Sequence, residues 1–512
     1  MGTLLNKLSF AFTILLIFGN SLSAQINNIP LSAAARYADE KILSKSRTPV
    51  NTGFKPLLYR RCSPLKTKDS LRNENETQFF KKHRKNWFNR KLFFENFVEI
   101  YSQDFSLTAN PIIDLRYKQI ESSGETYTLN TRGLELKGRL GSKTDYYTSF
   151  KENQGIFRPA LDSFIRERLV VPGQGARKDF KENGHDYASA SGYISYAPIP
   201  SVNLQLGRKK HFIGEGYRSM LLSDNAFNYP FAEFSWVYQG FQFNTVFAQF
   251  EDFEKIYYEY HRKKHAAFNY LSYNINNRAE LGVFEGVIYQ SIDTADYSYH
   301  LPTDFFIPIP GVRSLANKQN SEQLTLVGLN TKIIPFNYVM LYAQSVFQFN
   351  SKGVGFQVGV KCFDLFFNRL SGHSLFVQAE YNSANGNLYA QPQGGYNSWS
   401  HYNQEIAHPA GTNFNEILLH SEYRYKRFKL SASYFSIEKE NKNLTIFLSE
   451  EDIKNTSPEI ENFTLTRLRV GYTINPSYQL ELFAGLDIRN QTQRFILTGI
   501  RTNIYNFYTD FL

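Results

Sequence analysis

Two polar clusters hold the side chains of this sequence that are best suited to bind a ligand. The first, within 207–225, mixes basic, acidic and imidazole groups: Arg208, Lys209, His211, Glu215, Arg218 and Asp224. The second, within 399–416, contributes Trp399, Tyr402, Glu405 and His408. Basic groups pair with acidic ones and aromatic faces offer apolar surface to sugar rings. The ten residues therefore form a candidate ligand site, with an anionic or neutral glycan as its ligand.

Motifs for catalysis are absent from the sequence. Gly214-x-Gly216 lacks the third glycine and the βαβ context of a dinucleotide fingerprint. Neither a Gly-x-Ser-x-Gly elbow nor a His-Glu-x-x-His pair occurs. Cys62 and Cys362 have no partner at metal-ligand spacing. We therefore expect a protein that is not an enzyme and that uses no cofactor and no metal.

The composition limits the folds that could position these clusters. Of 512 residues, 34 are Tyr, 45 Phe and 3 Trp, whereas hydrophobic residues reach only 42%. A helical transporter would need repeated apolar runs of about 20 residues, and a disordered chain would be poor in aromatics. Two cysteines are too few for a disulfide scaffold of this length. A polar average with many aromatics is typical of a large β-barrel with a wet lumen and an apolar outer belt.

Residues 1–24 have the features of a signal peptide. Lys7 precedes an apolar stretch at 8–18, and small residues at 21–24 precede Gln25. The stretch is too short to span a bilayer. We expect export and cleavage after residue 24. An exported membrane protein without spanning helices must be a closed barrel, so we predict an outer-membrane location.

Residues 25–105 differ in pattern from the rest and predict a short, partly helical periplasmic region. Residues 32–40 read as a capped helix. Residues 78–97 are strongly basic with interleaved aromatics. This segment would either lie on an anionic membrane surface or polysaccharide, or pack as a soluble helix against a neighbouring domain. The second interpretation is favoured because charge runs are usually solvated faces.

From about residue 107 onward the apolar residues recur every second position. In 478–489, apolar residues at the even positions alternate with a mainly polar set that includes Glu481, Asp487 and Arg489. Counting such segments predicts an antiparallel transmembrane β-barrel of about 18 strands over 106–512. Long connections are expected at 154–184, 291–320, 385–411 and 440–461, and a last strand at 493–507. Charges facing such a lumen most often form a structural ion-pair network or tune a pore, an interpretation that stays open for both clusters.

The sequence around the two clusters resembles the capsule-assembly Wzi family. The strings are GRKKHFIGEGYRSMLLSDNAFNYPF (207–231), HAAFNYLSYNINNRAELGVFEGVIY (265–289) and HYNQEIAHPAGTNFNEILLHSEYRY (401–425). Together with 105–117, 130–141 and 145–154, they are most similar to the RemB-like gliding-motility branch. The resemblance implies an 18-stranded outer-membrane barrel with a helical periplasmic portion, acting in surface polysaccharide attachment or surface movement. The stretch 302–320 departs from the pattern of relatives, which puts the role of that loop in doubt.

Together these observations predict a non-enzymatic outer-membrane barrel that attaches surface polysaccharide or supports gliding. Its partners would be outer-membrane lipid, surface polysaccharide, the barrel-assembly machinery and other envelope or motility proteins. The net charge of +10 does not indicate nucleic acid, because the chain is exported. The first alternative is a component of the motility or protein-export machinery without glycan binding. The second is a diffusion porin.

Overall fold

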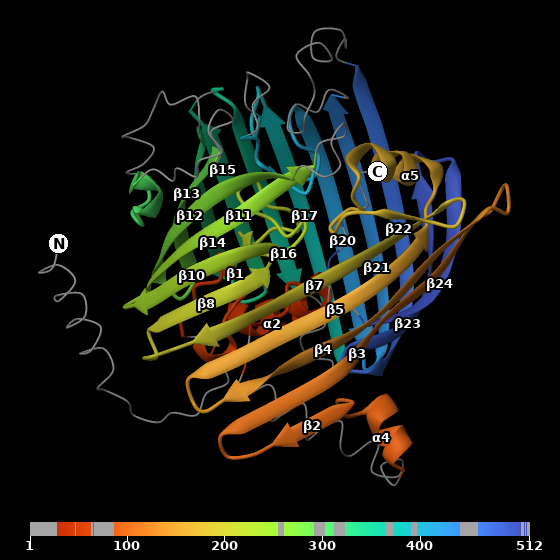
Figure 1. Ribbon diagram of the computed structural model, residues 1–512, viewed down its shortest axis with the longest axis horizontal. Coiled ribbons are helices and arrows are strands. Elements are labelled where there is room, and N and C mark those ends of the chain that lie inside the picture. The colour runs from red at the N-terminus through yellow and green to blue at the C-terminus, as the bar shows by residue number, and fades with distance from the viewer. Residues whose placement is uncertain are drawn as a thin grey trace, which may run out of the picture.

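The computed structural model forms a closed antiparallel barrel (Figure 1). It describes residues 28–62 except 47, then 65, 86–253, 261–290, 303–311, 323–349, 351–364, 372–390, 397–440, 459–502, 506 and 508. Over these residues, 18 strands make up the ring, and the last strand pairs with the first to close it. The predicted fold class is confirmed.

The strands of the ring follow one another in sequence order. They are β3 (Phe105–Ile120), β4 (Thr126–Leu140), β5 (Thr144–Ile156), β7 (Gly184–Tyr196), β8 (Val202–Lys209), β10 (Tyr229–Tyr238), β11 (Phe241–Phe253), β12 (His261–Asn276), β13 (Ala279–Gln290), β14 (Gln323–Phe336), β15 (Val339–Gln348), β16 (Val354–Phe363), β17 (His373–Asn385), β20 (Phe414–Tyr425), β21 (Phe428–Glu440), β22 (Ile460–Asn475), β23 (Leu480–Arg489) and β24 (Gln493–Thr502). Two short strands, β2 (Val98–Tyr101) and β6 (Lys178–Phe180), pair beside β3 and β7.

The alternation in the sequence sets the two faces of the barrel wall. In β23, Leu482 is 51% exposed and faces outward, whereas Asp487 is 5% exposed and faces the lumen. Val470 and Ile496 on the two neighbouring strands are also outward and exposed. Successive side chains of a strand point to opposite faces of the sheet. Each strand therefore has an apolar side that faces lipid and a polar side that faces the lumen.

The two ends of the barrel differ in their connections. One end has tight turns, such as Asn475–Leu480 between β22 and β23, which contains Pro476. The other end carries the long connections, which fall between strands where the sequence predicted them, although parts of all but the first lie outside the described residues. Outer-membrane barrels generally place short turns in the periplasm and long loops outside, and we call this second end the long-loop end. Helix α5 (Pro159–Arg168) lies at that end (Figure 1).

The helices of the described residues are short. Helix α2 (Ala33–Ser44) lies within the ring of strands and α4 (Trp87–Phe93) lies at the short-turn end (Figure 1). Two 3-10 turns, η1 (Tyr59–Arg61) and η2 (Thr303–Phe306), complete the set. In this part of the chain no helix combines the length and the apolar character needed to cross a membrane.

The basic segment 78–97 is only partly described, from residue 86 onward. Its α4 portion packs on the β22–β23 turn, where the side-chain amide of Asn475 donates to the carbonyls of Lys91 (2.9 Å) and Glu95 (3.0 Å). Trp87 and Phe88 stay 57% and 60% exposed. The helix is therefore docked on the barrel through its backbone carbonyls and through the ring of its C-cap residue Phe94, which contacts Arg427 (5.2 Å to the centroid), while Trp87 and Phe88 stay exposed.

The end of the chain differs from the predicted strand at 493–507. β24 ends at Thr502, and Tyr508 lies in the lumen, where its hydroxyl donates to Asp224 (2.7 Å). Tyr508 also packs against Ile437 of β21. The stretch 503–505 and residue 507 lie outside the described residues, so the predicted strand is described only to Thr502, and Asn506 also donates to Asp224 (2.9 Å).

Candidate functional site

The lumen is occupied by the N-terminal segment, residues 28–62, which we call the plug. The helix predicted near residues 32–40 is present as α2, and it lies inside the barrel and does not form a separate body. Glu40 of α2 pairs with Arg36 (3.2 Å) and with Lys361 of β16 (2.6 Å). Lys41 pairs with Asp364 at the end of β16 (2.5 Å). All but Lys41 of these groups are almost fully buried, so the helix is held to the wall by paired charges.

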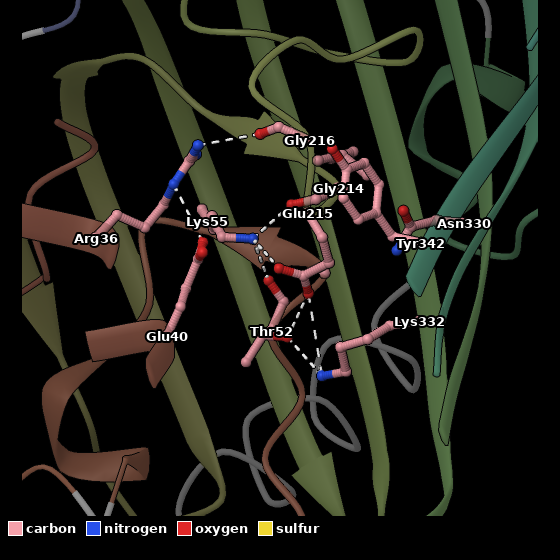
Figure 2. Close-up of polar contacts among 12 residues, drawn as sticks. Arg36, Glu40, Thr52, Lys55, Gly214, Glu215, Gly216, Asn330, Lys332 and Tyr342 are labelled. Carbon is pink, nitrogen blue, oxygen red and sulfur yellow. Dashed lines mark hydrogen bonds and ion pairs between the residues drawn. The ribbon is translucent and has the colours of Figure 1, made fainter. Parts of the chain in front are cut away.

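A second set of paired charges surrounds Glu215 and binds the plug to it (Figure 2). The ammonium of Lys55 lies 3.0 Å from Glu215, and Thr52 donates its hydroxyl to the same carboxylate. Lys332 of β14 pairs with Glu280 of β13 (2.8 Å) and donates to Thr52 (2.6 Å). Burial alone would raise the pKa of Glu215, but the nearby Lys55 and Lys332 ammonium groups outweigh it and lower that pKa. Glu215 is therefore a charged structural partner of the plug.

A two-stranded sheet joins the plug to the connection between β8 and β10. β1 (Phe54–Lys55) pairs antiparallel with β9 (Phe212–Ile213). Directly after β9, Gly214 has a φ of +119°, and a Cβ there would lie 2.2 Å from the amide nitrogen of Gln344. Glycine is required by this close approach and this backbone conformation, which explains the Gly214-x-Gly216 pair without a nucleotide.

The connection 210–228, which we call the lumen loop, enters from the long-loop end. Its Arg218 pairs with Glu416 of β20 (2.9 Å), and His408 contacts the other oxygen of Glu416 (2.7 Å). Glu380 of β17 accepts from the backbone nitrogens of Tyr217 (2.7 Å) and Arg218 (3.1 Å). Arg218, His408 and Glu416 are 1% exposed or less. The two sequence clusters thus meet at one buried salt bridge.

The other polar candidates also have partners within the protein. Lys209 and His211 both contact Glu233 of β10 (3.0 and 3.3 Å). Burial and the charge of Lys209 lower the pKa of His211 to about 4, so its imidazole is neutral at pH 7. The remaining pairs are Asp224 with Tyr508 (2.7 Å), Arg208 with Tyr402 (3.2 Å) and Glu405 with Arg168 of α5 (3.4 Å).

Trp399 and Tyr402 are not the exposed sugar platforms that the sequence predicted. Trp399 is fully buried, donates its indole N–H to the carbonyl of Leu221 (3.1 Å), and packs against Phe268 and Phe284. Tyr402 is 8% exposed. The prediction of an aromatic surface at these two positions is wrong because the 397–413 connection folds into the lumen. Tyr396, a third aromatic residue of this connection that could face a sugar, lies outside the described residues.

Of the ten candidate residues, nine are buried and only Arg208 is half-buried. The structure brings them together around the plug and the lumen loop, as the ion-pair alternative anticipated. Their role in ligand binding stays a prediction. Sequence patterns did not single out their partners Lys55, Lys332 and Glu380, because each lies in a different segment without a local motif.

A separate cavity of about 160 Å³ lies at the long-loop end, beside α5. We call it the basic cavity. Its described lining includes five cationic side chains, one carboxylate and three buried or half-buried aromatic rings: Arg116, Lys118, Arg158, Arg467, Arg489, Asp487, Tyr127, Phe157 and Tyr187. Sequence reasoning placed Asp487 and Arg489 on the lumen face but did not connect them with β3 or with the segment before α5.

Comparison with known proteins shows the fold. No family model matches the chain, and no curated protein does. Among solved structures, the chain is similar to Wzi, described as an outer membrane protein involved in group 1 capsule assembly in Escherichia coli and as a carbohydrate binding beta-barrel. The two share 12% identity over 93% of this chain and 99% of Wzi, with a TM-score of 0.56.

Barrels with lower scores also match. Acinetobacter baumannii OccAB2 shares 11% identity over 77% of this chain and 96% of its own, with a TM-score of 0.43. Pseudomonas aeruginosa OccK7 shares 8% identity over 78% of this chain and 98% of its own, with a TM-score of 0.41. The likeness to Wzi supports the predicted architecture. The resemblance to the RemB-like branch stays a prediction.

Proposed function

We propose that the protein is a non-enzymatic outer-membrane barrel that retains surface polysaccharide at the cell surface. It would reach that membrane after removal of residues 1–24 and insertion by the barrel-assembly machinery. The polysaccharide would meet the long-loop end, where the barrel opens toward the outside. The likeness to the carbohydrate-binding Wzi barrel supports this proposal at the level of fold.

The observation that carries the proposal is the filling of the lumen from both ends. The plug contacts β8, β12, β13, β14, β16 and β17, and the lumen loop contacts β15, β17 and β20. Both are held by buried ion pairs, which are costly to break. A barrel filled in this way is suited to holding a ligand in place, whereas a diffusion porin needs a continuous aqueous path.

The first test compares cells with and without the gene. We expect deletion to move polysaccharide from the cell surface into the medium while total synthesis stays the same. The measurement is cell-attached against shed polysaccharide, together with colony spreading in the same strain. Normal attachment with loss of spreading alone would overturn the proposal and favour a partner of the motility or export machinery.

The second test measures the purified protein. We expect the wild-type barrel to show no steady ion conductance in planar bilayers and to retain surface polysaccharide on a column. A variant lacking residues 28–62 serves as the positive control for conductance, because it removes the plug. Steady conductance of the wild type would favour the porin alternative.

A further inference from the structure

We propose that the basic cavity binds one carboxylate-bearing sugar unit of an acidic polysaccharide. The inference rests on the proposed function and specifies its substrate class and site. It concerns residues outside the two sequence clusters, at the long-loop end where an external polymer arrives.

The first argument is charge. Of the described lining residues, five are cationic and one, Asp487, is acidic. Asp487 is already shared by Lys118 (2.9 Å), Arg469 (2.5 Å) and Arg467 (3.7 Å). Arg116 is paired with Asp114, which lies outside the lining. Asp487 alone cannot neutralise the four remaining cations, so the cavity keeps a net positive charge that favours an anion.

The second argument concerns two of the guanidinium groups. Within the described residues, Arg158 and Arg489 form no ion pair and no side-chain hydrogen bond, and Arg158 has only the longer-range attraction of Asp487. Arg489 is 7% exposed and lies over the ring of Phe463 (4.4 Å to the centroid). Each guanidinium retains the planar set of donors that matches a carboxylate.

The third argument is the apolar part of the same lining. Phe157 and Leu129 pack against the buried cluster that contains Tyr187, which is 6% exposed, and all three line the cavity. Thr131 and Asn153, also in the lining, hydrogen-bond to each other (2.8 Å). Cations, a ring face and polar groups together match a uronate: the carboxylate, the apolar sugar face and the hydroxyls.

The size of the cavity limits the ligand to a single unit. Its volume of about 160 Å³ is below the roughly 300–1,000 Å³ of pockets that enclose drug-sized ligands. A polymer would therefore bind through one acidic residue at a time. Retention of a long chain would come from many weak contacts made by neighbouring barrels.

The test measures binding of trigalacturonate to the detergent-purified full chain by calorimetry, with maltotriose as the neutral probe. The variants are Arg158→Gln, Arg489→Gln and the double variant. Arg494→Gln is the matched control, because Arg494 lies at the same end but is outside the lining and is 60% exposed. We expect each cavity variant to weaken trigalacturonate binding by about tenfold, as for a lost charged hydrogen bond. The control should leave binding unchanged.

Equal binding of the two trisaccharides, or equal affinity of the cavity variants and Arg494→Gln, would overturn the inference. If a variant fails to fold, the salt dependence of trigalacturonate affinity in the wild type tests the cavity instead. Affinity that falls steeply with added salt supports the cavity, and affinity independent of salt contradicts it. Retention of native polysaccharide by both the wild type and the double variant would refute the cavity but keep the proposed function. Trigalacturonate binding without retention of native polysaccharide would keep the cavity as a carboxylate site but refute the proposed function.

Discussion

The plug interface and the basic cavity lie in the same lumen but differ in how their charges are balanced: acidic and basic groups are paired around the plug, whereas cations are in excess in the cavity. Around the plug, Lys55 pairs with Glu215, and Arg218 pairs with Glu416 on the other side of the lumen loop. In the cavity, Arg158 and Arg489 face a space whose described lining has a single carboxylate, Asp487. An unpaired buried charge is costly, so a folded protein keeps one only where water or a ligand can reach it.

This difference separates structural charges from candidate ligand-binding charges. The richest clusters of charged residues in the sequence belong to the structural group. The cavity cations are scattered along the chain, and only their positions around the closed ring bring them together. Density of charge along a sequence is therefore a poor guide to a binding site in a barrel, whereas imbalance of charge in space is informative.

The largest effect is expected from breaking a pair at the lumen loop. Arg218→Met leaves the buried Glu416 without its guanidinium and should lower the free energy of unfolding by about 3–5 kcal/mol. Urea titration of the barrel in lipid vesicles measures this. Arg494→Gln, an exposed arginine of the wall, is the control. A loss below 1 kcal/mol would mean that this pair is not structural.

The next effect concerns the buried indole. Trp399→Ala removes the contacts with Phe268 and Phe284 and the hydrogen bond to Leu221, and should destabilise the barrel by about 3 kcal/mol. Trp399→Phe should recover much of this loss. At temperatures where the Ala variant remains folded, polysaccharide retention should match the wild type. Selective loss of retention without loss of stability would restore Trp399 as a sugar contact.

The plug should loosen in acid. The pKa of Glu215 is lowered by its lysines, so its stabilisation is present above its unfolded pKa and is lost as pH falls. The pKa of His211 is lowered from 6.5 to about 4, so folding favours the neutral ring, and this stabilisation also declines below about pH 6.5. Glu215 and His211 therefore both make the folded plug less stable as pH falls.

Cys62 provides a probe of this opening, since it is 1% exposed within the plug. In a Cys362→Ser background, we expect its reaction with dithiodipyridine to be roughly tenfold faster at pH 4 than at pH 7, after correction for the reaction of a free thiol. A Glu215→Gln variant should show a smaller change with pH. Equal protection at both pH values would contradict the role of these groups.

The smallest change in the free energy of unfolding is expected for a cation of the cavity, in contrast to Arg218 at the lumen loop. Arg489→Gln removes a guanidinium that forms no ion pair with any described residue, so of its described side-chain contacts only the one with Phe463 is lost. The free energy of unfolding should change by less than about 1 kcal/mol, the range of a cation–π contact. The same urea titration measures it. A loss as large as that of Arg218→Met would show that Arg489 is structural and would remove the contrast between the two regions.

The fold was largely predictable because a barrel wall repeats one local rule. Alternation, as in Leu482 and Asp487, places each residue on a face without knowledge of its partners. The site was not predictable to the same degree. Lys55 meets Glu215 across 160 positions of sequence, and no local pattern records that contact. The contact of Tyr508 with Asp224 could not be predicted for the same reason.

By itself, the sequence determined the class of fold, the strand count of about 18, the lipid-facing side and the positions of the long loops, because all of these follow from periodicity and turn residues. Tertiary structure alone decided which charges are paired, that Trp399 is buried, that residues 28–62 fill the lumen, and that cations from β3, β22 and β23 surround one cavity. Those properties depend on ring closure, which joins the first strand to the last and places residues distant in sequence around a common space.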